Sequence, residues 1–144
     1  MLSKTCEYAI RAMIFIAQQG SSDDKLGIKA IASGIDAPAH FIAKILQELS
    51  RKGLVQSAKG PSGGFYLDKQ SRTISLADIV KAIDGDKIFT KCGLGLKNCS
   101  EKKPCPLHYQ FKPFREQFYQ MLKDSSVVDF SEQLHSGTRF LKRS

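Results

Sequence analysis

A change of residue periodicity near Gly53 is the feature that most constrains how this chain can fold. Before it, apolar residues recur at helical steps of three and four, as they do from Cys6 to Ala17. After it come a short run with strand propensity, the glycine-rich segment 59–64, and a second short run. The two runs span residues 54–58 and 65–67. The pattern predicts a β-hairpin placed directly after a set of helices.

The helices before the hairpin carry recognisable end signals. Ser3 can cap the first helix, and a short helix is expected at 28–33. Asp36 is the expected N-cap of the next helix, with Pro38 in its first turn. The order of helix, short helix, turn, helix and hairpin is that of a winged helix-turn-helix. In that fold the second helix of the motif enters the major groove of DNA with its N-terminal residues.

The charge of the chain agrees with a polyanionic partner. The sequence has 22 Lys and Arg against 14 Asp and Glu, a net charge of +8. Taken singly, the basic residues could form only a solvated face, but the order of elements together with the basic hairpin favours double-stranded DNA. The candidate DNA-binding residues are Lys29, Ala39, His40, Ala43, Lys44, Arg51, Lys59, Ser62, Gly63 and Gly64.

The second part of the chain differs in charge and pattern. Residues 1–86 carry a net charge of +2 and residues 87–144 carry +6. Between them, a helix capped by Ser75 is expected to end at Gly85. The predicted fold is mainly α with one small β-hairpin: a winged helix-turn-helix domain at 1–86, a cysteine loop at 87–108, and a long helix with a C-terminal tail at 109–144.

The long helix has an aromatic stripe that needs a cover. Pro106 is a candidate for its start, and Pro113 is expected either to kink the helix or to delay its beginning. Such a stripe on a small domain favours a contact with another subunit, although packing within one subunit would also cover part of it. Its members are Phe111, Phe114, Phe118, Met121 and Leu122.

The loop before this helix concentrates metal-binding side chains. Cys92, Cys99 and Cys105 are followed closely by His108. Thiolates are soft ligands that suit an iron–sulfur cluster or zinc. Bare thiols that sense oxidants are a further possibility for the same loop. The fourth cysteine, Cys6, lies on the apolar side of the first helix and is expected in the core.

Several separate segments together resemble the Rrf-type bacterial transcription regulators, the family of IscR and NsrR. The wing and the segment after it are the most specific. The matching segments are LSKTCEYAIRA at 2–12, IKAIA at 28–32, FIAKILQEL at 41–49, GLVQS at 53–57, KGPSGGFYL at 59–67 and ISLADIV at 74–80. Lys59 at the wing entry replaces the arginine of many members, which leaves the operator sequence open.

The resemblance implies a homodimer on a two-fold symmetric operator, with the long helix making the dimer contact. It also implies an iron–sulfur cluster on Cys92, Cys99 and Cys105. The fourth ligand is His108 if the chain follows the IscR branch, or Glu7 of the partner subunit if it follows the NsrR branch. The choice between a 2Fe–2S and a 4Fe–4S cluster stays open, and a structural zinc site is the alternative.

Other functions have little support in the sequence. No apolar run is long enough for a membrane span, and Glu7 and Arg11 interrupt the N-terminal apolar stretch, so a cytoplasmic protein is expected, at the nucleoid when bound to DNA. The chain has no Cys-x-x-Cys on a βαβ unit, and the segment 59–64 lacks the Gly-Lys-Ser/Thr ending of a phosphate loop. An enzyme with a small-molecule substrate is therefore not expected.

Overall fold

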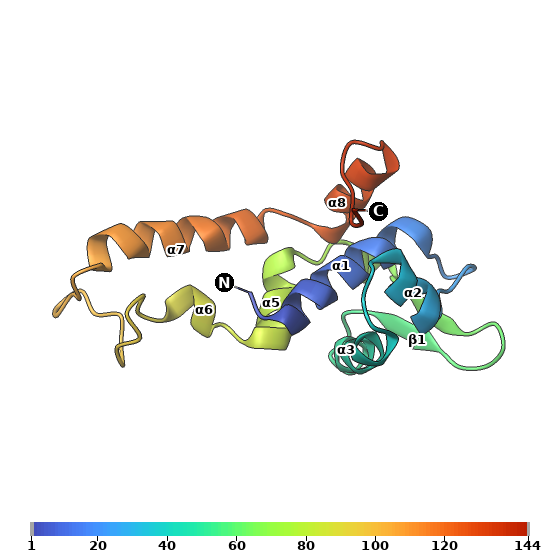
Figure 1. Cartoon of the computed structure of the whole chain (residues 1–144), viewed down its shortest axis with the longest axis horizontal. Coiled ribbons are helices and arrows are strands. Elements are labelled where there is room, and N and C mark those ends of the chain that lie inside the picture. The colour runs from blue at the N-terminus through green and yellow to red at the C-terminus, as the bar shows by residue number, and fades with distance from the viewer. Residues whose placement is uncertain (1, 144) are drawn as a thin grey trace.

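The computed structural model describes residues 2–143, which form helices and one two-stranded sheet (Figure 1). The helices and strands are α1 (Lys4–Gln19), α2 (Ile28–Gly34), α3 (Ala39–Arg51), β1 (Gln56–Ala58), β2 (Gly64–Tyr66), α4 (Lys69–Arg72), α5 (Leu76–Asp84), α6 (Lys87–Thr90), α7 (His108–Lys123) and α8 (Val127–His135). The prediction of a mainly helical fold with one small hairpin is confirmed. The helices α4 and α6 are single short turns that the sequence analysis did not predict.

Helix α1 is the centre of the fold. It packs against α2, α3, α5 and α8, and its apolar side, including Cys6 and Met13, is fully buried. The apolar stripe of α3 closes the same core from below in Figure 1, and Ile79 and Val80 of α5 complete it. The burial of Cys6 confirms the expected core role of this thiol.

The predicted helix caps are confirmed at two of three positions. The Ser3 hydroxyl accepts a hydrogen bond from the Cys6 N–H, and Ser75 forms a capping box with Asp78. The prediction for Asp36 was wrong. Asp36 adopts a left-handed conformation with φ 57° in the turn between the helices, and Pro38 occupies the N-cap of α3 without a side-chain cap. Asp tolerates this conformation better than most residues, which suits Asp36 to the turn and not to the N-cap of the helix.

The hairpin is shorter than the predicted one. The strands β1 and β2 pair antiparallel, with Ser57 opposite Phe65. Leu54 and Val55, predicted to be part of the first strand, precede it and lie in the core. Both are apolar side chains whose burial stabilises the fold more than exposure on a hairpin would. Leu26 extends the pairing on the other side through two backbone hydrogen bonds with Phe65, of 2.9 and 2.7 Å.

The remaining elements form an arm that leaves the winged helix and returns to it. Figure 1 shows α6 and α7 running side by side, away from the domain, joined at the far end by the cysteine loop. Helix α7 begins at His108 and contains Pro113, so the proline does not delay its start. The chain returns through α8, which packs on α1. Within residues 2–143, no helix has the length and apolar character needed to cross a membrane.

Candidate DNA interface and metal centre

The second helix of the helix-turn-helix motif offers its N-terminal end to solvent. Ala39, His40 and Lys44 are exposed and Ala43 is half-buried, while the opposite side of α3 lies in the core. The first N–H to bond back within α3 is that of Ile42, onto the Pro38 carbonyl at 3.2 Å. The earlier amides of the first turn therefore remain free to bind an anion at the positive end of the helix dipole.

The turn before this helix is held by a residue that the sequence analysis left without a role. Arg11 on α1 donates from Nη1 to the Ile35 carbonyl at 3.0 Å, and its guanidinium lies 5.0 Å from the centre of the Tyr8 ring. The Tyr8 ring stacks on Phe41, which is 49% exposed at the start of α3. Position 11 lies one helical turn after Glu7 and Tyr8, and no sequence signal connected it with the distant turn.

The wing contains glycines that the fold itself requires. Gly64 has φ 146°, and a Cβ there would come 2.7 Å from the Leu26 carbonyl oxygen. A Cβ on Gly63 would come 2.2 Å from the Ala58 carbonyl oxygen. The sequence analysis named these glycines as candidate DNA-binding residues, but their local geometry is a sufficient reason for glycine at both positions. Lys59 and Ser62 are exposed at the tip, where they can reach a phosphate backbone.

The other basic candidates differ in their surroundings. Lys29 is exposed on α2. Arg51, at the far end of α3, pairs with Glu48, which also pairs with Lys52 at 3.0 Å. Hydrogen bonds from Lys52 and Arg51 hold the pKa of the Glu48 carboxyl below its ordinary value. Arg51 is thus engaged within its own helix, whereas Lys44 has no such ion pair among the residues described.

The cysteine loop brings two thiols into contact. The Sγ atoms of Cys92 and Cys105 lie 3.6 Å apart, and Cys92 is buried. The backbone N–H of Leu94 lies 3.4 Å from the Cys92 sulfur. This N–H, with smaller contributions from the amides that follow and from Cys105, lowers the pKa of the Cys92 thiol. The loop therefore favours the thiolate at Cys92, the form that binds metal.

The other two candidate ligands form a second pair. Cys99 Sγ lies 3.5 Å from Nδ1 of His108, whose ring is buried. The other ring nitrogen, Nε2, lies 3.1 Å from a carboxylate oxygen of Glu101 but is not aligned for a hydrogen bond. Lys112 pairs with Glu101 and makes the largest contribution to lowering the pKa of the Glu101 carboxyl, and His108 makes the next largest. Across the described part of the chain, no three His, Cys, Asp or Glu side chains surround one point as a closed metal site would require.

Arg115 is the residue of this site that the sequence analysis missed. It lies on α7, two turns after His108 and on the same side of the helix, and only 6% of its surface is exposed. Its Nη1 donates to the Lys91 carbonyl at 2.5 Å, and its Nη2 lies 3.5 Å from Cys99 Sγ. The seven-residue spacing from His108 was the available signal.

The remaining predicted site residues lie elsewhere. Glu7 is exposed on α1 and pairs with Lys4 at 3.7 Å. Burial, reinforced by the negative charge of Asp84, raises the pKa of the Cys6 thiol to about 12. Cys6 is therefore a neutral core thiol, and Glu7 is not part of the cysteine loop of its own chain.

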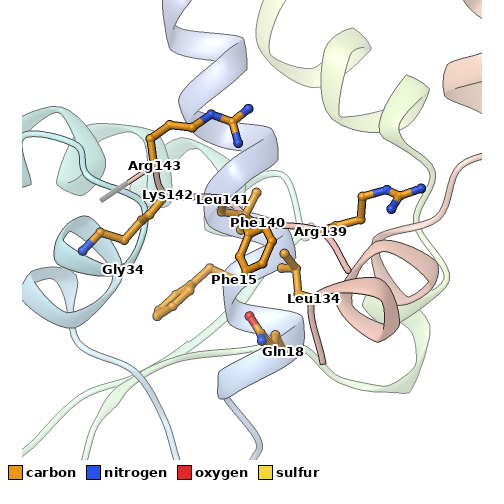
Figure 2. Close-up of a pocket in the computed structure, with 9 residues that line it drawn as sticks. All are labelled: Phe15, Gln18, Gly34, Leu134, Arg139, Phe140, Leu141, Lys142 and Arg143. Carbon is orange, nitrogen blue, oxygen red and sulfur yellow. The ribbon is translucent and has the colours of Figure 1, made fainter. Parts of the chain in front are cut away.

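A cavity of about 560 Å³ lies between α1, α2 and the C-terminal tail. Phe15 and Phe140 line it together with Arg139, Lys142 and Arg143. Figure 2 shows the charged ends of these three basic side chains pointing away from one another. They do not converge on a common point, so the cavity lacks the arrangement of donors that a bound anion needs.

Comparison with known proteins gives one family and consistent relatives. The model of the Rrf2 family, described as an iron-dependent transcriptional regulator, matches residues 2–133. An HTH-type transcriptional regulator of Aquifex aeolicus is 31% identical over 131 residues, which cover 90% of each chain. The HTH-type transcriptional regulator NsrR of Geobacillus kaustophilus is 26% identical, over 98% of this chain and 96% of the relative.

Solved structures share the fold. CymR of B. subtilis, a global cysteine regulator, has a TM-score of 0.74 and 20% identity, over 92% of this chain and 96% of that chain. IscR of T. potens has a TM-score of 0.74 and 17% identity, over 100% of this chain and 93% of that chain. These similarities support the winged-helix architecture with its attached arm.

Proposed function

This chain belongs to the Rrf2 family of transcriptional regulators, and from that premise we propose that it binds a symmetric DNA operator as a homodimer and senses its signal through an iron–sulfur cluster on the cysteine loop. Family membership makes it a regulator and not an enzyme. The observation that carries the proposal is the pairing of Cys92 with Cys105 and of Cys99 with His108 in one loop.

The DNA-binding part of the proposal rests on the exposed surface formed by α3 and the wing. The free amides of the first turn of α3 and the Lys44 ammonium can bind phosphates, while His40 can reach base edges in the major groove. Lys59 and Ser62 extend the contact to the neighbouring backbone. We assign Lys29 to the same phosphate contacts and give Arg51 a lesser part, because Glu48 already pairs with it.

Dimerisation is supported by the outer face of α7. Phe114 and Met121 are 50% and 55% exposed, whereas Leu122, about a quarter turn around the helix from them, is buried in the core. Phe114, Gln117, Phe118 and Met121 line a shallow groove along that face. An exposed apolar strip at helical spacing fits a second copy of the same helix. A Met121→Glu substitution should convert the dimer to monomer, as measured by light scattering after size-exclusion chromatography.

The four candidate ligands lie as two pairs, and the separation within each pair is compatible with two protein ligands on one metal. With metal–sulfur bonds of about 2.3 Å and metal–nitrogen bonds of about 2.0–2.1 Å, two ligands of one tetrahedral metal lie about 3.5–3.8 Å apart. The two pairs match this spacing, with separations of 3.6 and 3.5 Å. This pattern supports a 2Fe–2S cluster, with His108 as the fourth ligand, over a 4Fe–4S cluster, in which each iron takes one protein ligand. A bound cluster supplies one-electron redox chemistry and reactivity toward nitric oxide and oxygen.

The chain's own residues would then connect the loop to DNA. The loop joins α6 to α7, so a change in its ligands alters the position of α7 relative to the winged helix. If the two recognition helices of the dimer bind half-sites about 34 Å apart, a small displacement changes operator affinity without any contact between metal and DNA.

The test begins with anaerobic purification and measurement of iron, acid-labile sulfide and zinc. We expect two irons and two sulfides per chain, with visible absorption that is lost in Cys92→Ala. Cys6→Ala is the matched control and should keep the cluster. Operators selected from genomic fragments should then bind the loaded and cluster-free proteins with different affinity. Zinc without sulfide would overturn the cluster, and equal affinities would overturn its coupling to DNA.

A further inference from the structure

We propose that Arg115 is the positioning residue of the cysteine loop: its buried guanidinium joins Cys99 to the backbone at Lys91 and neutralises the thiolates that hold a metal. This assignment rests on the proposed function and names the residue of α7 through which the loop is coupled to the helix. Arg115 would act on the ligands and not as a ligand itself.

The contacts of Arg115 span the loop. One terminal nitrogen, Nη1, donates to the Lys91 carbonyl, next to the first cysteine, at 2.5 Å. The other, Nη2, lies 3.5 Å from the Sγ of Cys99. A single planar side chain therefore holds two points of the loop that are eight residues apart in the sequence. Lysine, with one ammonium group, does not reproduce this fork.

The charge of Arg115 has no carboxylate partner among residues 2–143. The salt bridges of the arm, which join Glu101 to Lys112 and His108, do not include it. Its Nε is buried without a hydrogen-bond partner. A buried guanidinium without a carboxylate partner is costly, and a metal–thiolate centre that includes Cys99 would supply the missing negative charge. The surroundings of Arg115 are thus built for an anionic form of the loop.

Packing fixes this arrangement from the same side of α7. The guanidinium lies 5.9 Å from the centre of the Phe111 ring. That ring lies against the backbone beside Cys92, where a Cβ on Gly93 would come 2.7 Å from it. His108, Phe111 and Arg115 therefore form one stripe of α7 that faces the loop. Any rearrangement of the thiols changes the contacts of this stripe.

The experiment compares wild type with Arg115→Gln and Arg115→Lys, and uses Lys123→Gln as the matched control from the same helix. Lys123 is exposed in the last turn of α7, at the opposite end from the cysteine loop, and takes part in no side-chain hydrogen bond or ion pair among the described residues. Three quantities are measured: cobalt(II) affinity of the apoprotein by thiolate-to-metal absorption, the midpoint potential of the reconstituted cluster, and hydrogen exchange of residues 91–99.

We expect Arg115→Gln to weaken cobalt binding about 10- to 100-fold, the usual cost of losing a residue that orients metal ligands. Its midpoint potential should become more negative, because a positive charge and a hydrogen bond to sulfur favour the reduced cluster. Arg115→Lys keeps the charge, so it should restore much of the potential but not the exchange protection. Lys123→Gln should resemble wild type in all three measurements.

The outcomes separate this assignment from the proposed function. A wild-type chain that takes up neither cobalt nor a cluster would overturn the proposed function and the electrostatic role of Arg115 together. A wild-type chain that loads normally, beside an Arg115→Gln variant with the same affinity, potential and exchange, would overturn the assignment to Arg115 alone. Equal loss in Arg115→Gln and Lys123→Gln would also overturn it, since the effect would then belong to the charge of the helix.

Discussion

The winged helix and the arm formed by α6, the cysteine loop and α7, residues 87–123, hold their shapes by different means. In the winged helix, aliphatic side chains from α1, α3 and α5 form one continuous buried core. Within the arm, all of which the structure describes, the buried side chains are Cys92, His108, Arg115 and, where α7 meets the core, Leu122. The arm also leaves a set of large apolar side chains exposed, namely Leu94, Leu96, Leu107, Tyr109, Phe114 and Met121.

This difference separates a region stabilised by an apolar core from a region whose conformation depends on the contacts of its thiols. Burial of hydrocarbon stabilises the winged helix whatever the state of the thiols. Near the winged helix the arm is held by apolar packing that includes Phe89 and Phe118. Its far end depends on a few polar contacts around two pairs of metal-binding side chains, so the conformation there is free to change with their ligands. The function we propose needs both properties, and each is confined to its own region of the molecule.

The largest expected effect comes from a cavity in the core of the winged helix. Leu49→Ala removes a fully buried side chain of α3, so the free energy of unfolding should fall by about 2–5 kcal/mol. The matched change in the arm, Leu96→Ala, removes an exposed side chain, and should alter the free energy of unfolding by less than about 0.5 kcal/mol. Urea denaturation followed by far-UV circular dichroism measures both. Similar losses in the two variants would contradict the distinction between the regions.

The reactivity of the thiols should differ between the two regions in the same way. The pKa of Cys6 is raised from 9.0 to about 12, so its thiolate fraction near pH 8 is roughly a thousandfold below that of an ordinary thiol. Iodoacetamide should therefore modify the loop cysteines of the native apoprotein long before Cys6, as followed by peptide mass spectrometry. The protein unfolded in urea, where all four thiols should react alike, is the control.

The same raised pKa gives a dependence of stability on pH. Above pH 9.0 the unfolded chain loses the Cys6 proton, while the native state retains it up to about pH 12. The unfolded state then binds fewer protons than the native state, so the free energy of unfolding should fall as the pH rises through this window. A Cys6→Ala variant should lack this component. Rapid labelling of native Cys6 at pH 8 would contradict both expectations.

A smaller effect is expected when single positive charges of the two regions are compared for their contribution to DNA binding. Lys59 lies at the wing and Lys97 in the cysteine loop, and both are exposed. Lys59→Ala should weaken operator binding and reduce the slope of log K against log salt by about 0.9, the value for one lost phosphate contact. Lys97→Ala should leave both unchanged. Fluorescence anisotropy at several salt concentrations measures the slopes, and equal slopes for both variants would place the arm on the DNA as well.

The features of the winged helix that the sequence predicted are those with local causes. Ser3 and Ser75 cap their helices as predicted, because a hydroxyl at the N-cap satisfies an amide two or three residues away. Two predictions failed because another part of the structure determines the residue. Asp36 serves the turn before α3 and not the helix end, and Leu54 and Val55 are buried in the core and not paired in the hairpin. A local sequence pattern carries no information about such tertiary contacts.

The candidate metal centre was predictable in composition but not in arrangement. The sequence identified Cys92, Cys99, Cys105 and His108 from residue type and spacing. It did not indicate which donors pair, because loop conformation decides that Cys92 meets Cys105 and Cys99 meets His108. Arg115 was missed because a basic residue on a helix is usually solvated, and only its position in three dimensions shows that it is buried.

The return of the chain to the winged helix has a mechanical consequence. Leu76 donates to the Ser125 carbonyl at 2.9 Å and Val127 donates to the Ile74 carbonyl at 3.0 Å, which clamps the end of α7 beside the capped start of α5. The 16 residues of α7 make a lever about 24 Å long with its fulcrum at this clamp. A movement of about 2 Å at the loop end of such a helix is a rotation of roughly 5° at the fulcrum. The arm can thus convert a displacement the size of one bond into a turn of the whole DNA-binding domain.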